Sequence, residues 1–527
     1  MKKLSLSFIF ILSSIIGTFA QSGTKLEAEN ANYVDCTVVS DSKYSGGKAL
    51  QLTEGTAKIT FTYAASEKGK YTIYVGYDGL YGEKVANLSV NGSTGTFQIK
   101  NEQTETAVGT YFMSQGSNEI VITPSWTWFR IDYIRIEKSN SPIPFNISSS
   151  PVDPQSAACA KTLYSFLYNN FGNKTISGIM TGDMKSANGN VTQHDDVKAV
   201  YQASGKYPAL VGFDFMNATG KDEATSYSKD YTNDVIELAK DTWQRGGIPA
   251  FTWHWRDPSR KTGEFYVTVD DKPACTMKIS DAMNADGSWN TSSTLYQNII
   301  KDIDAIADHF LTLQNAGVAC IFRPLHESSG GWFWWGREGA EPFKKLYHLL
   351  YDEMVNVKGV HNVIWVWNAG EYDQDWNPGE TYYDVVSADI YNKAYDYSSN
   401  YVLFDKLKVL TGGKKILALS ENGPIPDIDK EFDEEAVWSW WMPWYHTWGG
   451  GYVNQTSKEE WTKCMNDERV VTLEDLSAGW DAYTDIKIRK VERQNSQAIY
   501  DLQGRQLSEI PRKGLYIRGG KIMYHTK

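Results

Sequence analysis

Residues Ala319–Glu327 read Ala-Cys-Ile-Phe-Arg-Pro-Leu-His-Glu, a short apolar run that ends in polar and charged residues. A near-continuous apolar run of this length is typical of a strand that is buried on both faces of a parallel sheet. In a barrel of parallel strands, functional side chains gather where the strands end. The stretch therefore predicts a buried strand and a functional group at its carboxyl end.

Seven further runs of the same kind occur on either side of it, separated by segments of helical length. Eight β/α units within residues 156–481 predict an α/β domain with a (β/α)8 TIM-barrel fold. The eight runs are Thr175–Asp183, Tyr207–Met216, Ile248–Trp255, Ala319–Glu327, Asn362–Gly370, Tyr382–Asn392, Lys415–Pro424 and Val437–His446. The clearest helical segments are Asp234–Gln244, Tyr296–Gln314 and Phe343–Val357.

Residues 24–138 show a different pattern, with short alternating runs, turn signals such as Asn91-Gly92 and no helical periodicity. This pattern predicts an all-β module, a jelly roll or β-sandwich, in front of the barrel. Residues 139–155 are rich in Ser and Pro and predict a linker. The expected strands are Lys58–Tyr63, Lys70–Tyr77, Val85–Val90, Thr96–Ile99, Glu119–Thr123 and Arg130–Glu137.

The first 20 residues predict export. Lys2 and Lys3 precede the apolar run Leu4–Ile16, and small residues follow up to Ala20. This arrangement is that of a signal peptide, residues 1–20, and no later apolar run is long enough to span a membrane. We expect a secreted or cell-surface protein.

The composition limits the kinds of molecule that the protein is expected to bind. The 527 residues carry 64 acidic and 52 basic side chains, a net charge of −12, which disfavours binding to nucleic acid. The five cysteines form no metal-binding pair, so no structural zinc is implied. All of the 19 tryptophans except Trp126 and Trp128 lie between Trp243 and Trp480. This density suits stacking on sugar rings, although packing in an aromatic core would also account for it.

Two glutamates stand at strand ends, Glu327 after the fourth run and Glu421 in Leu419-Ser420-Glu421-Asn422-Gly423 of the seventh. Strands four and seven face each other across the mouth of a barrel. A retaining glycosidase needs two carboxyl groups about 5–5.5 Å apart, one to protonate the leaving oxygen and one to attack the sugar. The pair predicts a glycoside hydrolase.

Residues 323–336, Arg-Pro-Leu-His-Glu-Ser-Ser-Gly-Gly-Trp-Phe-Trp-Trp-Gly, resemble the signature of glycoside hydrolase family 26, the β-mannanases. The resemblance implies that Glu327 is the acid/base and Glu421 the nucleophile, with no cofactor for catalysis. We expect the aromatic neighbours Trp332 and Trp334 to raise the pKa of Glu327. Ser328-Ser329 departs from the Asn-rich form that many relatives have after the acid/base.

The same resemblance assigns further substrate-binding positions. It implies that Arg323 keeps the nucleophile ionised and that Tyr391 donates a hydrogen bond to it. For the sugar platform after strand eight, Trp440, Trp441, Trp444 and Trp448 compete, and Trp444 is favoured. The implied positions are His254, Arg323, His326, Trp332, Asp389, Tyr391 and Trp444.

The front module is similar to carbohydrate-binding modules of families 35 and 6 through Leu26–Glu29, Ser45–Lys48 and Ile131–Ile134. The similarity implies a structural Ca²⁺ held by Glu27, Glu29 and Asp132, because carboxylate oxygens suit that ion. It also implies that Trp128 stacks on sugar. For Trp126, packing beneath its loop is the alternative.

Residues 482–527, with Ile499–Arg505 and Gly514–Ile517, resemble the C-terminal sorting domains of Bacteroidetes type IX secretion. A frayed C-terminal hairpin is the simpler alternative.

The expected activity is that of an endo-β-1,4-mannanase, a monomer acting on mannan, glucomannan or galactomannan. Three alternatives stay open. Xylan or mixed-linkage glucan could be the preferred substrate, or the enzyme could release mannobiose from chain ends, with the insertion Gly263–Trp289 closing the cleft. A non-catalytic glycan-binding protein would need to lack one of the two glutamates.

Overall fold

The computed structural model describes residues 23–139, 143–445 and 451–476, together with four short strands of the C-terminal tail. The predicted signal peptide, residues 140–142 of the predicted linker, Trp448, Trp480 and most of the predicted sorting tail lie outside the described residues. The chain forms two compact units whose main segments meet between Pro144 and Phe145, and each is described by itself.

The N-terminal unit consists of two antiparallel sheets, as predicted for an all-β module. One sheet has the order β3-β4-β11-β6-β9, with β1 paired to β11, and the other has the order β2-β5-β10-β7-β8. The strands are β1 (Thr24–Glu27), β2 (Asn32–Val34), β3 (Cys36–Ser40), β4 (Lys48–Leu52), β5 (Lys58–Ala65), β6 (Gly69–Gly79), β7 (Lys84–Val90), β8 (Ser93–Ile99), β9 (Gln103–Met113), β10 (Gly116–Pro124) and β11 (Phe129–Lys138).

The sequence analysis missed five of these strands, and β9 is the longest of them. Its first half, Gln-Thr-Glu-Thr, is polar, and Gly109 interrupts the alternation. The register of β9 against β6 shifts at this point. Gly109 has a φ of 152°, close to the Tyr111 ring. A bulge of this kind breaks the period-two pattern on which the prediction of strands depends.

The second unit is the predicted barrel, with all eight strands inside the predicted runs. Their order, β18-β17-β16-β15-β14-β13-β12-β19, is parallel throughout. The ring closes between β18 and β19, where the Ser439 N–H donates to the Leu417 carbonyl at 2.8 Å. The strands are β12 (Thr175–Met180), β13 (Leu210–Asp214), β14 (Ile248–Thr252), β15 (Cys320–Arg323), β16 (Val363–Asn368), β17 (Val385–Ile390), β18 (Ile416–Asn422) and β19 (Trp440–Trp441).

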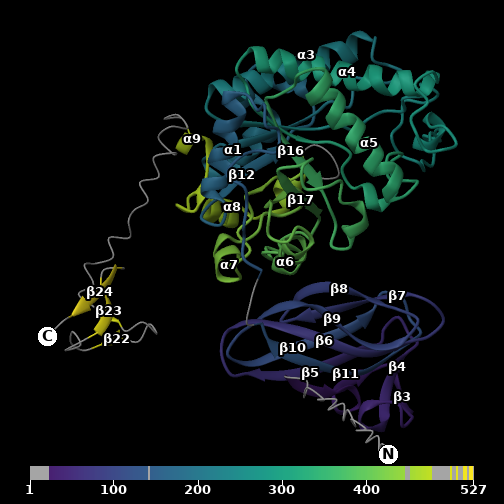
Figure 1. Cartoon of the computed structure of the whole chain (residues 1–527), viewed down its shortest axis with the longest axis vertical. Coiled ribbons are helices and arrows are strands. Elements are labelled where there is room, and N and C mark those ends of the chain that lie inside the picture. The colour runs from purple at the N-terminus through teal and green to yellow at the C-terminus, as the bar shows by residue number, and fades with distance from the viewer. Residues whose placement is uncertain are drawn as a thin grey trace, which may run out of the picture. The chain divides into compact units, whose positions relative to one another are not determined.

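Helices lie outside this ring of strands (Figure 1). The three helical segments predicted from sequence correspond to α3, α4 and α5, and α5 continues into a π-helical turn at Glu353–Val357. The helices are α1 (Ala158–Asn170), α2 (Asp195–Ser204), α3 (Ser226–Gln244), α4 (Thr294–Asn315), α5 (Ala340–Asp352), α6 (Tyr401–Leu410), α7 (Ile428–Asp433), α8 (Lys458–Met465) and α9 (Leu473–Leu476).

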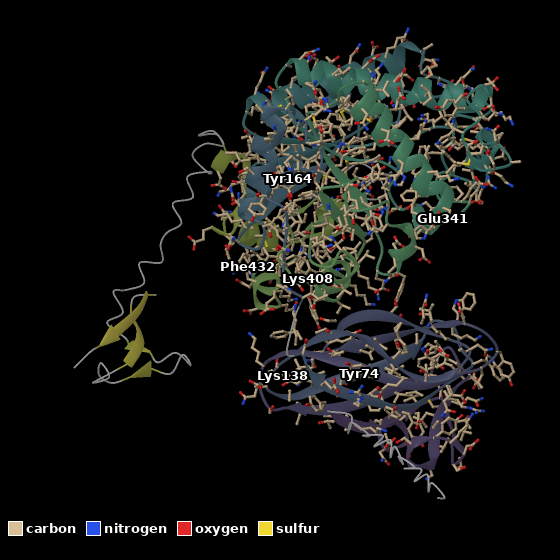
Figure 2. All side chains as sticks on the ribbon, viewed as in Figure 1. Tyr74, Lys138, Tyr164, Glu341, Lys408 and Phe432 are labelled. Carbon is tan, nitrogen blue, oxygen red and sulfur yellow. The ribbon has the colours of Figure 1, made fainter. Side chains whose placement is uncertain are left out.

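Side chains crowd the interior of the barrel, whereas Glu341 of α5 lies at its surface (Figure 2). Ten tryptophans of this unit are less than 2% exposed, so the tryptophan density of the sequence is mostly core packing. The ten are Trp253, Trp255, Trp334, Trp335, Trp365, Trp367, Trp438, Trp440, Trp441 and Trp461.

The remaining described strands are β20 and the four strands of the C-terminal tail. Strand β20 (Val470–Val471) pairs with β12. The tail strands β21 (Ile499–Tyr500), β22 (Gln506–Leu507), β23 (Gly514–Arg518) and β24 (Lys521–His525) form one antiparallel sheet. None of the described helices combines the length and the apolar character needed to cross a membrane.

Candidate active site

Glu327 and Glu421 meet at the carboxyl ends of the barrel strands. Glu421 is the last residue but one of β18, and Glu327 lies four residues beyond the end of β15. One carboxylate oxygen of each lies within 4.8 Å of the other, and Asp389 of β17 supplies a third oxygen within the same distance. This separation is close to the 5–5.5 Å of retaining glycosidases and well below the 6.5–9.5 Å of inverting enzymes.

The backbone that presents Glu327 is strained. Leu325 and Glu327 both have left-handed φ angles, 52° and 53°, which residues with a Cβ rarely adopt. The Glu327 N–H donates to Asn368 Oδ1 at 2.8 Å. The Trp332 ring covers Gly330 so closely that a Cβ there would lie 2.1 Å from it. The loop therefore needs glycine at this position, and the carboxyl group is held away from its relaxed backbone geometry.

Glu421 is buried and has a partner on each oxygen. The Arg323 guanidinium pairs with Oε1. The Tyr391 hydroxyl donates to Oε2 at 2.6 Å. Both partners are the ones that the sequence analysis placed beside it, and together they fix the direction in which the Glu421 carboxylate points.

Arg323 provides the positive charge for the whole cluster. It is 2% exposed, and it also donates to Asp389 Oδ2 at 2.7 Å. Although burial alone would lower its pKa, the charges of Asp389 and Glu421 raise it above the ordinary value. Three carboxylates within this distance would repel one another without such a charge. The guanidinium contacts both Asp389 and Glu421, and its positive charge offsets their negative charges.

The environment of Glu327 raises the pKa of its carboxyl, as predicted, and burial is the main cause. Burial raises the pKa of the Glu327 carboxyl, and the charge of Glu421 adds to the rise. Trp332 acts in the opposite direction, because its Nε1–H donates to Glu327 Oε2 at 2.9 Å. Trp334 is fully buried, and its Nε1–H donates to the Trp255 carbonyl at 2.6 Å.

The two predicted histidines form a buried chain at the base of the site. His254 Nδ1 lies 2.5 Å from Asp214 Oδ2, and its Nε2 lies 3.2 Å from His326 Nε2. Burial tends to lower the pKa of His254, but the charge of Asp214 outweighs it and raises that pKa. Burial, Arg323 and His254 hold the pKa of His326 well below its usual value. These directions favour the charged form for His254 and the neutral form for His326, an arrangement in which His254 Nε2 donates to His326 Nε2.

The remaining predicted positions also lie at this end of the barrel. The Trp444 ring is 5.9 Å from that of His254 and is itself 6% exposed, and Trp440 and Trp441 are almost fully buried in β19. Trp332 is 46% exposed and Tyr391 is 42% exposed, so both present ring faces to solvent. The arrangement brings together every barrel residue that the sequence analysis proposed for the site.

The sequence analysis missed Asp214, Thr252 and Asn368. Each is the last residue of its strand, β13, β14 and β16 respectively, so the rule that led to Glu327 and Glu421 would have found all three. Thr252 Oγ1 lies 3.2 Å from His326 Nδ1 and completes the histidine chain.

The insertion Gly263–Trp289 packs against the loop that carries Trp332. The Val267 N–H donates to the Trp332 carbonyl at 2.8 Å, and the Trp334 N–H donates to the Phe265 carbonyl at 3.1 Å. Tyr266 forms a bridge with Phe333 in the same segment. These bonds fix the insertion beside Glu327.

The front module has its own candidate residues. Trp128 is 48% exposed, and its ring lies edge-on to that of Tyr81, which is 77% exposed, at 5.9 Å between centroids. Both residues have left-handed φ angles, 74° and 61°. Trp126 is 68% exposed, so the alternative that it packs beneath its loop is wrong.

Glu27, Glu29 and Asp132 also come together in this module. The Ser45 hydroxyl donates to Glu27 Oε1 at 2.7 Å, and the Ser45 N–H donates to Asp132 Oδ2 at 3.1 Å. The other oxygen of Asp132 and one oxygen of each glutamate are buried without a hydrogen-bond partner among the described residues. Burial, together with the charges of Glu27 and Glu29, raises the pKa of Asp132 to about 6.

A (β/α)8 barrel defines a glycoside hydrolase when it carries two glutamates close together at the ends of strands four and seven. Here one carboxylate oxygen of each lies within 4.8 Å of the other, and the buried Glu421 is charge-paired. The family model "Glycosyl hydrolase family 26" matches residues 152–474, and "Carbohydrate binding module (family 35)" matches residues 24–139. The chain belongs to glycosyl hydrolase family 26.

Individual relatives agree with this assignment. A mannan endo-1,4-beta-mannosidase of Thermothelomyces thermophilus is 32% identical over 87% of this chain and 91% of its own. A GH26-CBM35 β-(1,4)-mannanase of Podospora anserina is 30% identical, with a TM-score of 0.56 over 87% of this chain and 100% of its own. A β-mannanase from a symbiotic protist of the termite Reticulitermes speratus is 39% identical, with a TM-score of 0.56 over 63% and 98%.

Proposed function

We propose that this enzyme is an endo-β-1,4-mannanase that cleaves internal bonds of β-mannan polysaccharides with retention of configuration. The separation of at most 4.8 Å between oxygens of Glu327 and Glu421 carries the retaining assignment. The substrate class rests on relatives that are named mannan endo-1,4-beta-mannosidases. The match to this chain covers most of the length of each of them.

In the first step of this mechanism, the Glu421 carboxylate attacks the anomeric carbon while Glu327 gives its proton to the leaving oxygen. The Arg323 and Tyr391 bonds hold the attacking carboxylate in place. Burial raises the pKa of Glu327, which favours the protonated form before the reaction. Catalysis needs no group beyond these side chains and water.

The second step uses the same pair of carboxyl groups, and Glu327 now acts as a base instead of an acid. Once Glu421 is esterified to the sugar it is neutral, and the charge that helped to raise the pKa of Glu327 is gone. Glu327 then ionises more readily and accepts a proton from the water that attacks the intermediate. The carboxylate pair thus resets itself in each cycle.

The other site residues surround the sugar whose glycosidic bond is cleaved. We assign His254, His326, Trp332, Asp389 and Trp444 to the wall of this subsite, because they border the carboxylate pair. The termite symbiont's mannanase was crystallised with a gluco-manno-oligosaccharide. We therefore include glucomannan among the substrates of this enzyme.

Product analysis over time tests the proposed activity. Incubation with linear mannan should give a rapid fall in viscosity and a range of oligosaccharides from the first minutes, because internal bonds are cut at random. The first reducing ends, followed by NMR, should be β-anomers. Mannobiose as the only early product would indicate release from chain ends, and faster hydrolysis of xylan or mixed-linkage glucan would overturn the substrate assignment.

We propose that the front module binds the same polysaccharide through Trp128 and the neighbouring Tyr81. Exposed aromatic rings held at left-handed backbone positions are costly unless they serve a ligand. We expect Trp128→Ala to lower retention on insoluble mannan about tenfold, since burying an aromatic face is worth ~1.5 kcal/mol or more. Activity on short soluble oligosaccharides should stay at the wild-type level.

The matched control is Tyr33→Ala on strand β2. Tyr33 is also an exposed aromatic residue of the module, 41% exposed, and it lies on the other sheet from β11. It should leave retention unchanged. Equal retention of wild type and Trp128→Ala in a pull-down assay would remove Trp128 from the binding site.

We also propose that Glu27, Glu29 and Asp132 hold a structural Ca²⁺. The residues fit that ion, because their buried oxygens without partners are hard ligands, and a Cβ at Gly46 would lie 2.7 Å from Glu29 Oε1. Ca²⁺ at about 100 times its dissociation constant should stabilise the module by ~2.7 kcal/mol.

Thermal unfolding with Ca²⁺ and with EGTA measures this effect. The Ca²⁺-dependent rise in unfolding temperature should disappear in Asp132→Asn and persist in Glu119→Gln, which changes an exposed acid of the same module. An Asp132→Asn variant that still gains stability from Ca²⁺ would place the ion elsewhere.

We propose, finally, that the chain is exported, that residues 1–20 are a signal peptide and that residues 482–527 are a sorting tail. The four tail strands pair with one another and, among the described strands, with none of the barrel. Deletion of residues 482–527 should therefore leave a folded, active barrel and move the enzyme from the cell surface or medium to the periplasm of a type IX-secreting host. Loss of mannan hydrolysis in the purified truncated protein would contradict this separation.

A further inference from the structure

Asn368, the last residue of β16, lies between the two halves of the active site. Its side chain is buried, at 4% exposure. Its Oδ1 accepts the Glu327 N–H at 2.8 Å, and its Nδ2 donates to Asp389 Oδ1 at 2.9 Å. One amide group therefore joins the main chain of one carboxyl-bearing residue to the partner of the other.

The chain of bonds continues from Asp389 to Glu421. Arg323 donates to Asp389 at 2.7 Å and pairs with Glu421 through its other terminal nitrogen. The Arg323–Glu421 link is buried and the other links are partly buried, and each hydrogen bond is strongest in one geometry. The position of Glu327 relative to Glu421 is thus defined by a connected set of side chains as well as by the barrel.

The link to Glu327 acts on a strained residue. Glu327 has a φ of 53°, and its N–H would lose its hydrogen bond if the Asn368 oxygen were removed. A buried N–H without an acceptor is unfavourable, so the backbone would rotate to find another partner. A rotation at this φ moves the carboxyl group at the end of the same residue.

An asparagine is the side chain that fits both partners. An aspartate could accept from the Glu327 N–H, but it would set a carboxylate against Asp389. Alanine and leucine offer neither bond. Because the amide presents one acceptor and one donor on the same short stem, it satisfies both sides at once.

We propose that Asn368 is a positioning residue that holds Glu327 at the distance and angle needed for proton transfer. This inference rests on the proposed function, in which Glu327 protonates the leaving oxygen and later activates water. Asn368 acts on Glu327 through the backbone N–H, and its bond to Asp389 fixes the direction of the amide group.

The test compares two substrates in the full-length Asn368→Ala variant. Mannan has a poor leaving group, so its kcat/KM should fall about 10²-fold, as expected for a proton donor displaced by ~1 Å. A dinitrophenyl β-mannobioside needs little protonation, so its initial burst of dinitrophenol should stay within a few-fold of the wild-type rate. Azide should accelerate its steady-state turnover, because azide attacks the intermediate without a base.

Asn362→Ala is the matched control. Asn362 is a fully buried asparagine immediately before the same strand, at the opposite end of the barrel, and its amide donates to the Phe310 and Val318 carbonyls at 3.2 and 2.8 Å. Its loss should lower stability without a difference between the two substrates and without an azide effect. If Asn368→Ala does not fold, Asn368→Ser, which is too short to reach both partners, should show the same difference between substrates.

Glu327→Ala, measured alongside, separates this inference from the proposed function. If Glu327→Ala shows the substrate difference and the azide effect but the Asn368 variants lose both activities equally, the positioning role is wrong and the proposed function stands. If Glu327→Ala itself shows no such difference, the assignment of Glu327 fails first.

Discussion

Glu421→Ala should abolish hydrolysis of mannan and of dinitrophenyl β-mannobioside alike, with turnover lower by on the order of 10⁴-fold or more. The reason is that the substitution removes the oxygen that attacks the anomeric carbon, and a good leaving group does not replace it. Stopped-flow release of dinitrophenol should show no burst, because no covalent intermediate forms.

Two further observations make this result specific. Glu421→Gln keeps the size of the side chain and should be as inactive as Glu421→Ala, while thermal unfolding shows that the barrel remains folded. Azide, added with the activated substrate, fills the space of the lost carboxylate and should give the α-mannosyl azide. A β-azide from Glu421→Ala would require the roles of Glu421 and Glu327 to be exchanged.

The barrel could be predicted because its strands are buried on both faces. Each of the eight strands lies inside an apolar run, and the burial of β12 and β16 is complete along their whole length. The front module was harder to predict, since its strands alternate and its sheet contains register shifts. The shift beside Gly109 hid β9, and the short edge strands β2 and β3 are mostly exposed.

The carboxylate pair could also be predicted, because strand ends are recognisable in the sequence. What the sequence does not contain is the set of contacts among those ends. Asn368 is separated from Glu327 by 41 positions, and Asp214 from His254 by 40. Only the closed ring of strands brings them within hydrogen-bond distance.

The prediction for Trp332 included its apolar ring but not its hydrogen bond to Glu327. An aromatic neighbour suggests a dry wall that raises the pKa of the carboxyl. The structure instead directs the indole N–H at the carboxylate, which favours the charged form. Residue type alone does not distinguish these cases, because the orientation of the ring depends on Gly330 and the loop around it.

Glu327→Ala should affect the two chemical steps of the reaction differently. Removal of the proton donor should lower kcat on mannan by about 10²–10⁴-fold. The first step with dinitrophenyl β-mannobioside should survive, because dinitrophenolate leaves without a proton. The intermediate should then accumulate, since no base activates water for the second step, and its mass should be detectable on the intact protein.

Azide decides whether Glu327 is the base of that second step. It should raise steady-state turnover of Glu327→Ala and give the β-mannosyl azide, while it leaves the wild-type enzyme unaffected. The alkaline limb of the wild-type pH profile should disappear in the variant, because that limb reports ionisation of a carboxyl whose pKa is raised by burial and by Glu421. An unchanged alkaline limb, or an α-azide, would show that another group donates the proton.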